Sequence, residues 1–255
     1  MPVDAGTPTL VASPPDPEAV RELADGRERV LATIAQAAAR SGRQPSDVTL
    51  VAVSKTVPSA RLRAATAAGL ELFGENRVQE AAAKVDEVPG ARWHLVGPLQ
   101  ANKARRAIGL FEAIESVDSV ALALRLDRLA REVEPVRRLT VYLQVNVNDD
   151  PSKAGFDPSG LERALPELLR LAGLRIAGLM TIGRLVSGPE RARPTFGALR
   201  ELSARLRTAH PGLGPELSMG MSDDYPIAVE EGATVVRVGR ALFGERPPAT
   251  AADPS

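Results

Sequence analysis

Residues 48–54 read Val48-Thr49-Leu50-Val51-Ala52-Val53-Ser54, a run that is almost wholly apolar and rich in β-branched residues. A short apolar run of this kind is typical of a strand buried on both faces, as strands in parallel sheets are. Comparable runs follow near 70–73, 92–96, 111–115, 139–147, 174–180, 215–218 and 234–238. The sequence therefore predicts a parallel sheet of eight strands.

Helical patterns separate these strands, and they cover 58–68, 75–87, 101–109, 118–133, 158–172, 189–209 and 223–231. Strands that alternate with helices imply right-handed crossovers and a parallel sheet. Because eight such strands can close on themselves, we predict an α/β fold with a single (β/α)8 TIM-type barrel. An open doubly wound sheet is the alternative, but no Gly-x-Gly-x-x-Gly motif follows the first strand to support it.

The ends of the chain differ from the barrel region. Asp16 followed by Pro17 is a typical helix start, and the pattern predicts an extra N-terminal helix running to about Arg40. Residues 1–15 and 246–255 are rich in Pro, Ser, Thr and Ala without periodicity, which predicts disordered tails. The barrel domain is therefore expected to span 16–245.

The overall composition narrows the functional classes. The 255 residues carry 32 basic and 32 acidic side chains, so no basic excess favours binding to nucleic acid or a membrane surface. The absence of cysteine excludes disulfides, thiolate metal sites and a cysteine nucleophile. Neither a secretory signal nor an apolar run of membrane-spanning length is seen. We expect a cytoplasmic protein.

Lys55 follows the first strand directly and is one of four lysines beside twenty-eight arginines. Arginine stays protonated in proteins, whereas a desolvated lysine can lose its proton, and only a neutral amine attacks a carbonyl. Lys55 is therefore a candidate Schiff-base residue. The alternative is an ordinary strand-end cation, and position alone favours that alternative.

Polar clusters follow several predicted strands, at the end of a barrel where chemistry usually sits. Each has an ordinary explanation: Asn76 and Asn102 as helix caps, the Asp223–Asp224 pair as a capped first turn, and Trp93 and His94 as core residues. Lys84 is expected to be a solvated partner of Glu80, four residues earlier. These explanations do not account for six clusters at one end of one barrel.

The loops after the seventh and eighth strands form the usual phosphate site of this fold. Gly220 and Gly239 permit close backbone approach, Ser218 and Ser222 offer hydroxyls, and Arg237 supplies a cation. With Lys55 across the barrel mouth, pyridoxal phosphate (PLP) bound as an aldimine is one candidate. A Schiff-base aldolase acting on a sugar phosphate would use the same groups.

The chain resembles the pyridoxal phosphate homeostasis protein family and, more distantly, the N-terminal barrel of alanine racemase. The most specific matches are Ser218-Met219-Gly220-Met221-Ser222-Asp223-Asp224 and Gly97-Pro98-Leu99-Gln100 followed by Asn102-Lys103. Other matching segments are 51–56, 73–80, 93–96, 145–155, 178–180 and 236–244.

The resemblance implies a role for each matching residue. Lys55 would be the aldimine lysine, and Ser218, Ser222 and the N–H groups of Gly239 and Arg240 would contact the phosphate. Arg237 would face the pyridine nitrogen and keep it unprotonated. The residues expected near the ring are Asn76, His94 and Met219. A small Thr is expected where this chain has Arg240, whose guanidinium could turn towards the phosphate or away from it.

The resemblance also implies a monomer that binds, buffers or delivers PLP, with PLP-dependent apoenzymes as partners and no metal. Two-base racemisation needs a second acid or base opposite the lysine, and the only tyrosines are Tyr142 and Tyr225. An arginine on the ring nitrogen also weakens the electron sink that PLP chemistry uses. We therefore expect no catalytic residues; a PLP-dependent racemase of narrow scope is the alternative.

Overall fold

The structure is a computed structural model that describes residues 14–133, 137–183 and 188–244. Its strands close into a barrel in chain order, and every neighbouring pair is parallel, so the predicted (β/α)8 barrel is confirmed. The strands are β1 (Thr49–Val53), β2 (Leu72–Glu75), β3 (Arg92–Leu95), β4 (Ala113–Val117), β5 (Leu139–Gln144), β6 (Leu174–Met180), β7 (Glu216–Ser218) and β8 (Val235–Val238).

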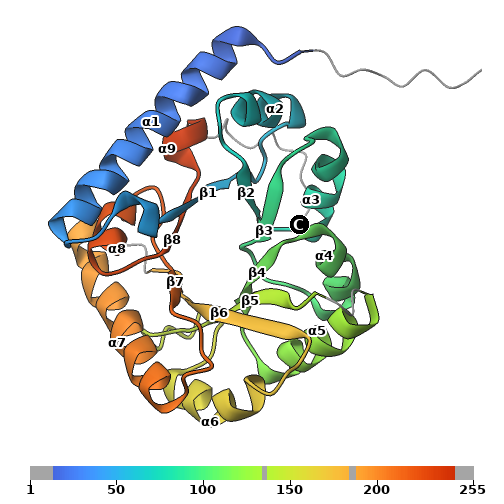
Figure 1. The fold of residues 1–255 in the computed structure, drawn as a ribbon, viewed down its shortest axis with the longest axis vertical. Coiled ribbons are helices and arrows are strands. Elements are labelled where there is room, and N and C mark those ends of the chain that lie inside the picture. Colours follow the sequence, from blue (N-terminus) through green and yellow to red (C-terminus); the bar gives the residue numbers. More distant parts are fainter. Residues whose placement is uncertain (1–13, 134–136, 184–187, 245–255) are drawn as a thin grey trace, which may run out of the picture.

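Helices surround this barrel on its outer side (Figure 1). They are α1 (Pro17–Arg40), α2 (Ser59–Ala67), α3 (Val78–Lys84), α4 (Ala104–Leu110), α5 (Val120–Val133), α6 (Pro158–Leu168), α7 (Arg193–Ala209), α8 (Tyr225–Glu230) and α9 (Arg240–Phe243). Short 3-10 turns cover Pro45–Asp47, Val85–Glu87, Ala101–Lys103 and Pro189–Ala192. No helix in the described ranges is long and apolar enough to cross a membrane.

The extra N-terminal helix begins where the sequence predicts. The Asp16 side chain accepts a hydrogen bond from the Glu18 N–H, and Pro17 occupies the first position of α1. Helix α1 runs along the outside of the barrel and packs on α2, α8 and α9 (Figure 1). It therefore joins the first and last βα units. The predicted tails lie outside the described residues, except for 14 and 15.

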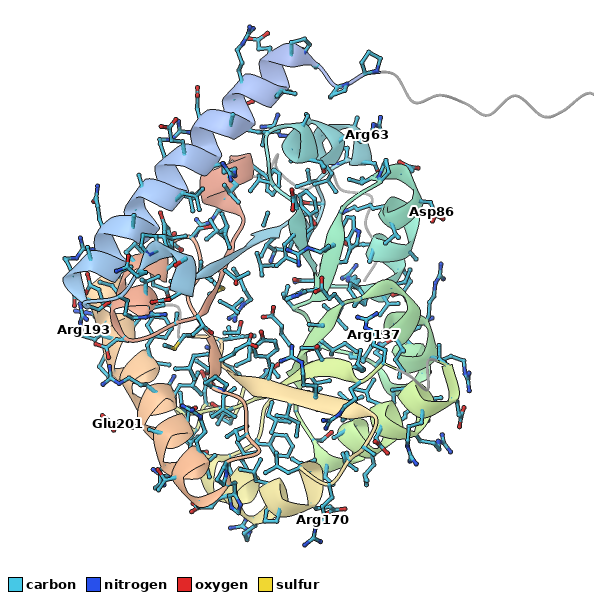
Figure 2. All side chains as sticks on the ribbon, in the orientation of Figure 1. Arg63, Asp86, Arg137, Arg170, Arg193 and Glu201 are labelled. Carbon is cyan, nitrogen blue, oxygen red and sulfur yellow. The ribbon has the colours of Figure 1, made fainter. Side chains whose placement is uncertain are left out.

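Ion pairs support this arrangement of α1. Arg40 of α1 and Arg193 of α7 both contact Glu230 of α8, at 2.6 and 2.7 Å. Arg193 lies beside one end of α1. Arg170, in the turn after α6, and Glu201 of α7 lie on the outer side, away from the barrel axis (Figure 2). Glu230 of α8 thus connects α1 to α7.

Two strands begin and end two residues later than predicted. The apolar residues Leu70 and Phe111 pack in the core ahead of β2 and β4. Strand β2 instead extends to Glu75, and β4 runs through Glu115, which the prediction included, to Val117. Polar residues usually end a buried strand, but both glutamates have buried partners. The predicted helix at 75–87 accordingly begins only at Val78.

The barrel separates two apolar regions. One cluster lies inside the barrel and includes Val51, Leu72, Tyr142 and Val235. The other cluster, which includes Ala52, packs outwards against the helices. This division follows from the alternation of side chains along each strand. Side chains project into the barrel interior from all sides (Figure 2). Some of these side chains are polar, so the barrel interior is not a purely apolar core.

Candidate functional site

A pocket of about 270 Å³ opens where the carboxyl ends of β1 and β8 meet. Residues from both strand-end loops line it, and these are Val53, Lys55, Thr56, Val57, Pro58, Arg61, Gly239, Arg240, Phe243 and Gly244. Lys55 is half-buried there. The structure therefore brings the candidate amine and the predicted phosphate loop into one pocket.

Lys55 lies beside the phosphate loop, and the expectation that it lies across the barrel mouth is wrong. Strands β1 and β8 pair directly, with Val51 opposite Arg237 and Ala52 opposite Val238. Because a closed barrel joins its first strand to its last, the loops that follow them must be neighbours. Lys55, which follows β1, and the loop that follows β8 are thus separated by one strand spacing.

Backbone strain marks the residue after Lys55. Thr56 has a φ of 65°, in the left-handed region that a β-branched residue rarely adopts. Such a conformation costs about 1–3 kcal/mol and persists only when the surroundings impose it. Here the Val57 N–H bonds to the Ser54 carbonyl, which turns the chain sharply at Lys55. The turn directs the chain from β1 into α2.

The loop after β7 folds back onto the start of α9. The Ser222 Oγ accepts hydrogen bonds from the N–H groups of Gly239 and Ala241, at 3.1 and 3.4 Å. Gly220 has a φ of 93°, and an added Cβ would lie 2.5 Å from that of Ala228. Only glycine fits this turn. The loop thus presents a hydroxyl and two backbone donors at the same point.

Arg240, the departure from the family pattern, turns away from these donors. Its guanidinium donates to the Asp223 carboxylate on the loop after β7, and the pair is largely exposed to solvent. The side chain therefore bridges two loops at the pocket rim, where it is also one of the lining residues.

Arg237 and Ser218 lie deeper, inside the barrel. Arg237 is 4% exposed, and its guanidinium donates to the Thr181 carbonyl at 2.7 Å and to the Ser218 Oγ. Burial lowers the pKa of Arg237 below its ordinary value, against the attraction of Glu115 and Asp224. Because the ordinary pKa of arginine lies far above neutral pH, the Arg237 guanidinium stays charged. The Ser218 hydroxyl in turn donates to Glu115 at 2.6 Å.

His94 is buried in the same interior. Its Nδ1 lies 2.7 Å from a Glu115 oxygen, and Glu115 is completely buried. Glu115 is a functional candidate that the sequence interpretation missed, because it appeared only as the end of an apolar run. The one available signal was a carboxylate in a strand with no basic residue nearby in sequence.

Asn76 and Met219 occupy different environments. Asn76 follows β2 and is half-buried; it is not a helix cap, because Arg77 is the N-cap of α3. Gly97 lets β3 end against it, since an added Cβ would lie 2.4 Å from the Asn76 carbonyl oxygen. Met219 is fully buried and packs in the outer apolar core.

Lys84 contradicts the expectation of a solvated helix partner. It is 9% exposed, and its Nζ donates to Glu75 at 2.7 Å and to the carbonyl of Ser54 at 2.9 Å. The Ser54 hydroxyl also donates to Glu75. This buried cluster fixes the residue that precedes Lys55. Glu80 pairs instead with Arg77, at 3.8 Å.

Replacing Glu75 with glutamine should lower the free energy of unfolding by about 3 kcal/mol, because it leaves the Lys84 charge buried without a countercharge. Burial raises the pKa of Glu75, although hydrogen bonds from Lys84 and Ser54 oppose this. The intact pair therefore stabilises little, while breaking it costs much. Urea unfolding measures the change.

Glu80→Gln is the matched control, since its contact with Arg77 is long, at 3.8 Å, and the Arg77 side chain is exposed, so the pair should contribute about 0.5 kcal/mol or less. Equal losses in the two variants would show that the Glu75–Lys84 pair has no special role.

Comparison with known proteins identifies the family of this chain. Residues 10–247 match the family described as alanine racemase, N-terminal domain. The pyridoxal phosphate homeostasis protein of Pseudomonas aeruginosa is 43% identical over 226 residues, which cover 88% of this chain and 96% of that protein. The protein of the same name from Aquifex aeolicus is 40% identical over 220 residues, covering 86% and 96%. The chain belongs to the pyridoxal phosphate homeostasis protein family.

Solved structures support membership of the pyridoxal phosphate homeostasis protein family. PipY of Synechococcus elongatus, solved with PLP bound, is 46% identical, covers 87% of this chain and all of its own, and superposes with a TM-score of 0.76. Alanine racemase of Clostridium difficile, at 14% identity and a TM-score of 0.71, covers 93% of this chain and 63% of its own. The second likeness shows the barrel fold alone.

Proposed function

We propose that this protein binds PLP in the pocket between β1 and β8 and takes part in intracellular PLP homeostasis. Lys55 would hold the cofactor as an aldimine, and the protein would buffer or deliver it. The observation that carries the proposal is that Lys55 shares one pocket with Gly239 and Arg240. PipY, a relative solved with PLP bound, supports it.

The residues present suit a phosphate. The N–H groups of Gly239 and Ala241 converge on the Ser222 hydroxyl, so a phosphate oxygen could accept from the same donors. The backbone contact expected at Arg240 needs no side chain, and its guanidinium is already paired with Asp223. Because the Ser218 hydroxyl serves Glu115 and Arg237, we assign Ser218 to Arg237 and not to the phosphate.

The residues also suit a pyridine ring. Arg237 uses its two terminal nitrogens within the barrel, and its Nε makes no hydrogen bond to any residue that the structure describes. That N–H would donate to the pyridine nitrogen, which would then stay unprotonated. Asn76 follows β2 near the mouth, while His94 would act through Glu115 from inside the barrel. Met219 packs in the outer apolar core and would act by supporting the loop after β7.

The same geometry favours a carrier over an enzyme. PLP supplies an electron sink when its ring nitrogen is protonated, and an arginine donor opposes that protonation. Tyr142 lies in β5, and its hydroxyl donates to Glu216 inside the barrel. Tyr225 is buried at the start of α8. Neither tyrosine is placed as a second base, so we propose binding without amino-acid turnover.

The setting of this function is also a proposal. We infer a cytoplasmic monomer whose partners are PLP and PLP-dependent apoenzymes, with no nucleic acid, membrane or metal involved. The balanced charge of the chain supports the absence of a polyanionic partner.

An absorbance spectrum tests the proposal. Purified protein mixed with PLP should show a visible band that borohydride bleaches, and the labelled peptide should contain Lys55. A colourless protein that uses Lys55 on a sugar phosphate would instead identify a lyase. Loss of optical rotation from L-amino acids, catalysed by the loaded protein, would identify a racemase.

A further inference from the structure

The buried centre of the barrel contains one carboxylate beside the Arg237 guanidinium. Glu115 of β4 is completely buried, and its Oε2 lies 3.8 Å from a terminal nitrogen of Arg237. Ser218 bridges the two, because its hydroxyl donates to Glu115 and accepts from Arg237. The three side chains come from β4, β7 and β8, so their meeting depends on barrel closure.

Both oxygens of Glu115 are engaged. Oε2 accepts from Ser218 at 2.6 Å, and Oε1 lies 2.7 Å from Nδ1 of His94 on β3. Tyr142 of β5 also faces this interior, but its hydroxyl donates to Glu216. Glu115 is thus held from two sides, and it has little freedom to move away from Arg237.

Charge balance explains why a carboxylate stands here. An ion buried without a counterion is strongly unfavourable, and salt screens a buried pair much less than a surface pair. Burial by itself would raise the pKa of Glu115, but the hydrogen bond and charge of His94 and the charge of Arg237 bring it below the ordinary value. Glu115 is therefore ionised at neutral pH. Asp224 also attracts Arg237, from the N-terminal end of α8.

We propose that Glu115 is a positioning residue for Arg237: it fixes the guanidinium through Ser218 and offsets its charge. The Nε–H of Arg237 is then left for the pyridine nitrogen of PLP. This inference rests on the proposed function, which places Arg237 against the ring. It assigns a role to a residue outside the pocket lining, through a contact that is already present without the cofactor.

A double-mutant cycle on the cofactor-free protein tests the pairing. Glu115→Gln and Arg237→Met should each lower the urea midpoint, because each removes one partner of a buried ion pair. The double variant should lose clearly less than the sum of the two, because it removes both charges. Additive losses would overturn the pairing. Glu115→Asp keeps the charge and should retain most of the stability.

The spectrum of bound PLP tests the consequence for the ring. Glu115→Gln leaves the Arg237 charge unbalanced, which disfavours a proton on the bound cofactor. The pH midpoint of its visible band should therefore fall, by about one pH unit. Glu115→Asp should restore a midpoint near that of the unchanged protein. A purely structural role would not give this recovery together with the shift.

Asp127→Asn is the matched control. Asp127 is a buried carboxylate of α5 that accepts from the Gly173 N–H and from Arg131, both at 2.7 Å, away from the barrel interior. An unshifted midpoint in Glu115→Gln, or an equal shift in Asp127→Asn, would overturn the proposal. If the unchanged protein takes up no PLP, the proposed function itself fails, and the cycle still decides whether Glu115 pairs with Arg237.

Discussion

Replacing Lys55 with alanine should abolish every borohydride-stable link between the protein and PLP while the fold stays intact. The amine is the only group in the pocket that can form a Schiff base, and its removal deletes no core side chain. Electrospray mass measurement after reduction should show complete labelling of the unchanged protein and none of the variant. The thermal midpoint of the cofactor-free protein should change little.

Lys103→Ala is the matched control, because it removes another of the four lysines from the start of α4, outside the pocket lining. It should label as the unchanged protein does. A Lys55→Ala protein that still carries a covalent label on another lysine would contradict the assignment.

Replacing Gly239 with valine should weaken PLP binding by about tenfold to a hundredfold. An added Cβ would already lie 3.2 Å from the Val53 carbonyl oxygen, so the larger side chain must displace the backbone at the pocket. Losing one charge-assisted hydrogen bond from the Gly239 N–H costs about 1.5–3 kcal/mol, which corresponds to that change in affinity. Equilibrium dialysis with PLP measures it.

Labelling at Lys55 should persist in Gly239→Val when PLP is raised well above the new dissociation constant, because the amine is untouched. Gly109→Val is the control, at a helical glycine where an added Cβ meets nothing within 4 Å. Equal affinities for PLP in the two variants would show that the phosphate does not contact the loop after β8.

Periodicity predicted the barrel well, because its signal is spread over the whole chain. Eight apolar runs separated by helical patterns define the strands even when single boundaries shift. The end of β2 was placed too early because Glu75 is polar, and a linear sequence does not show that Lys84 lies beside it in the folded protein. A buried pair of this kind depends on how a strand and the helix that follows it pack together.

The positions of some candidate site residues could be predicted from the sequence. Lys55 and Gly239 sit at strand ends, a position that the fold itself marks as functional. The direction of the Arg240 side chain could not be predicted from sequence, because it depends on the contact with Asp223. The buried position of Ser218 could not be predicted either, because it depends on hydrogen bonds with Glu115 and Arg237. The burial of Lys84 was missed since helical spacing offered Glu80 as a simpler partner.

The pairing of β1 with β8 also bears on how the protein matures during synthesis. Lys55 leaves the ribosome after about a fifth of the chain, whereas Gly239 emerges near its end. A nascent chain can therefore expose the Lys55 amine long before the proposed phosphate contacts after β8 exist. If the proposed site binds PLP, stable binding must wait until the final strand has packed, so cofactor loading would report that folding is finished.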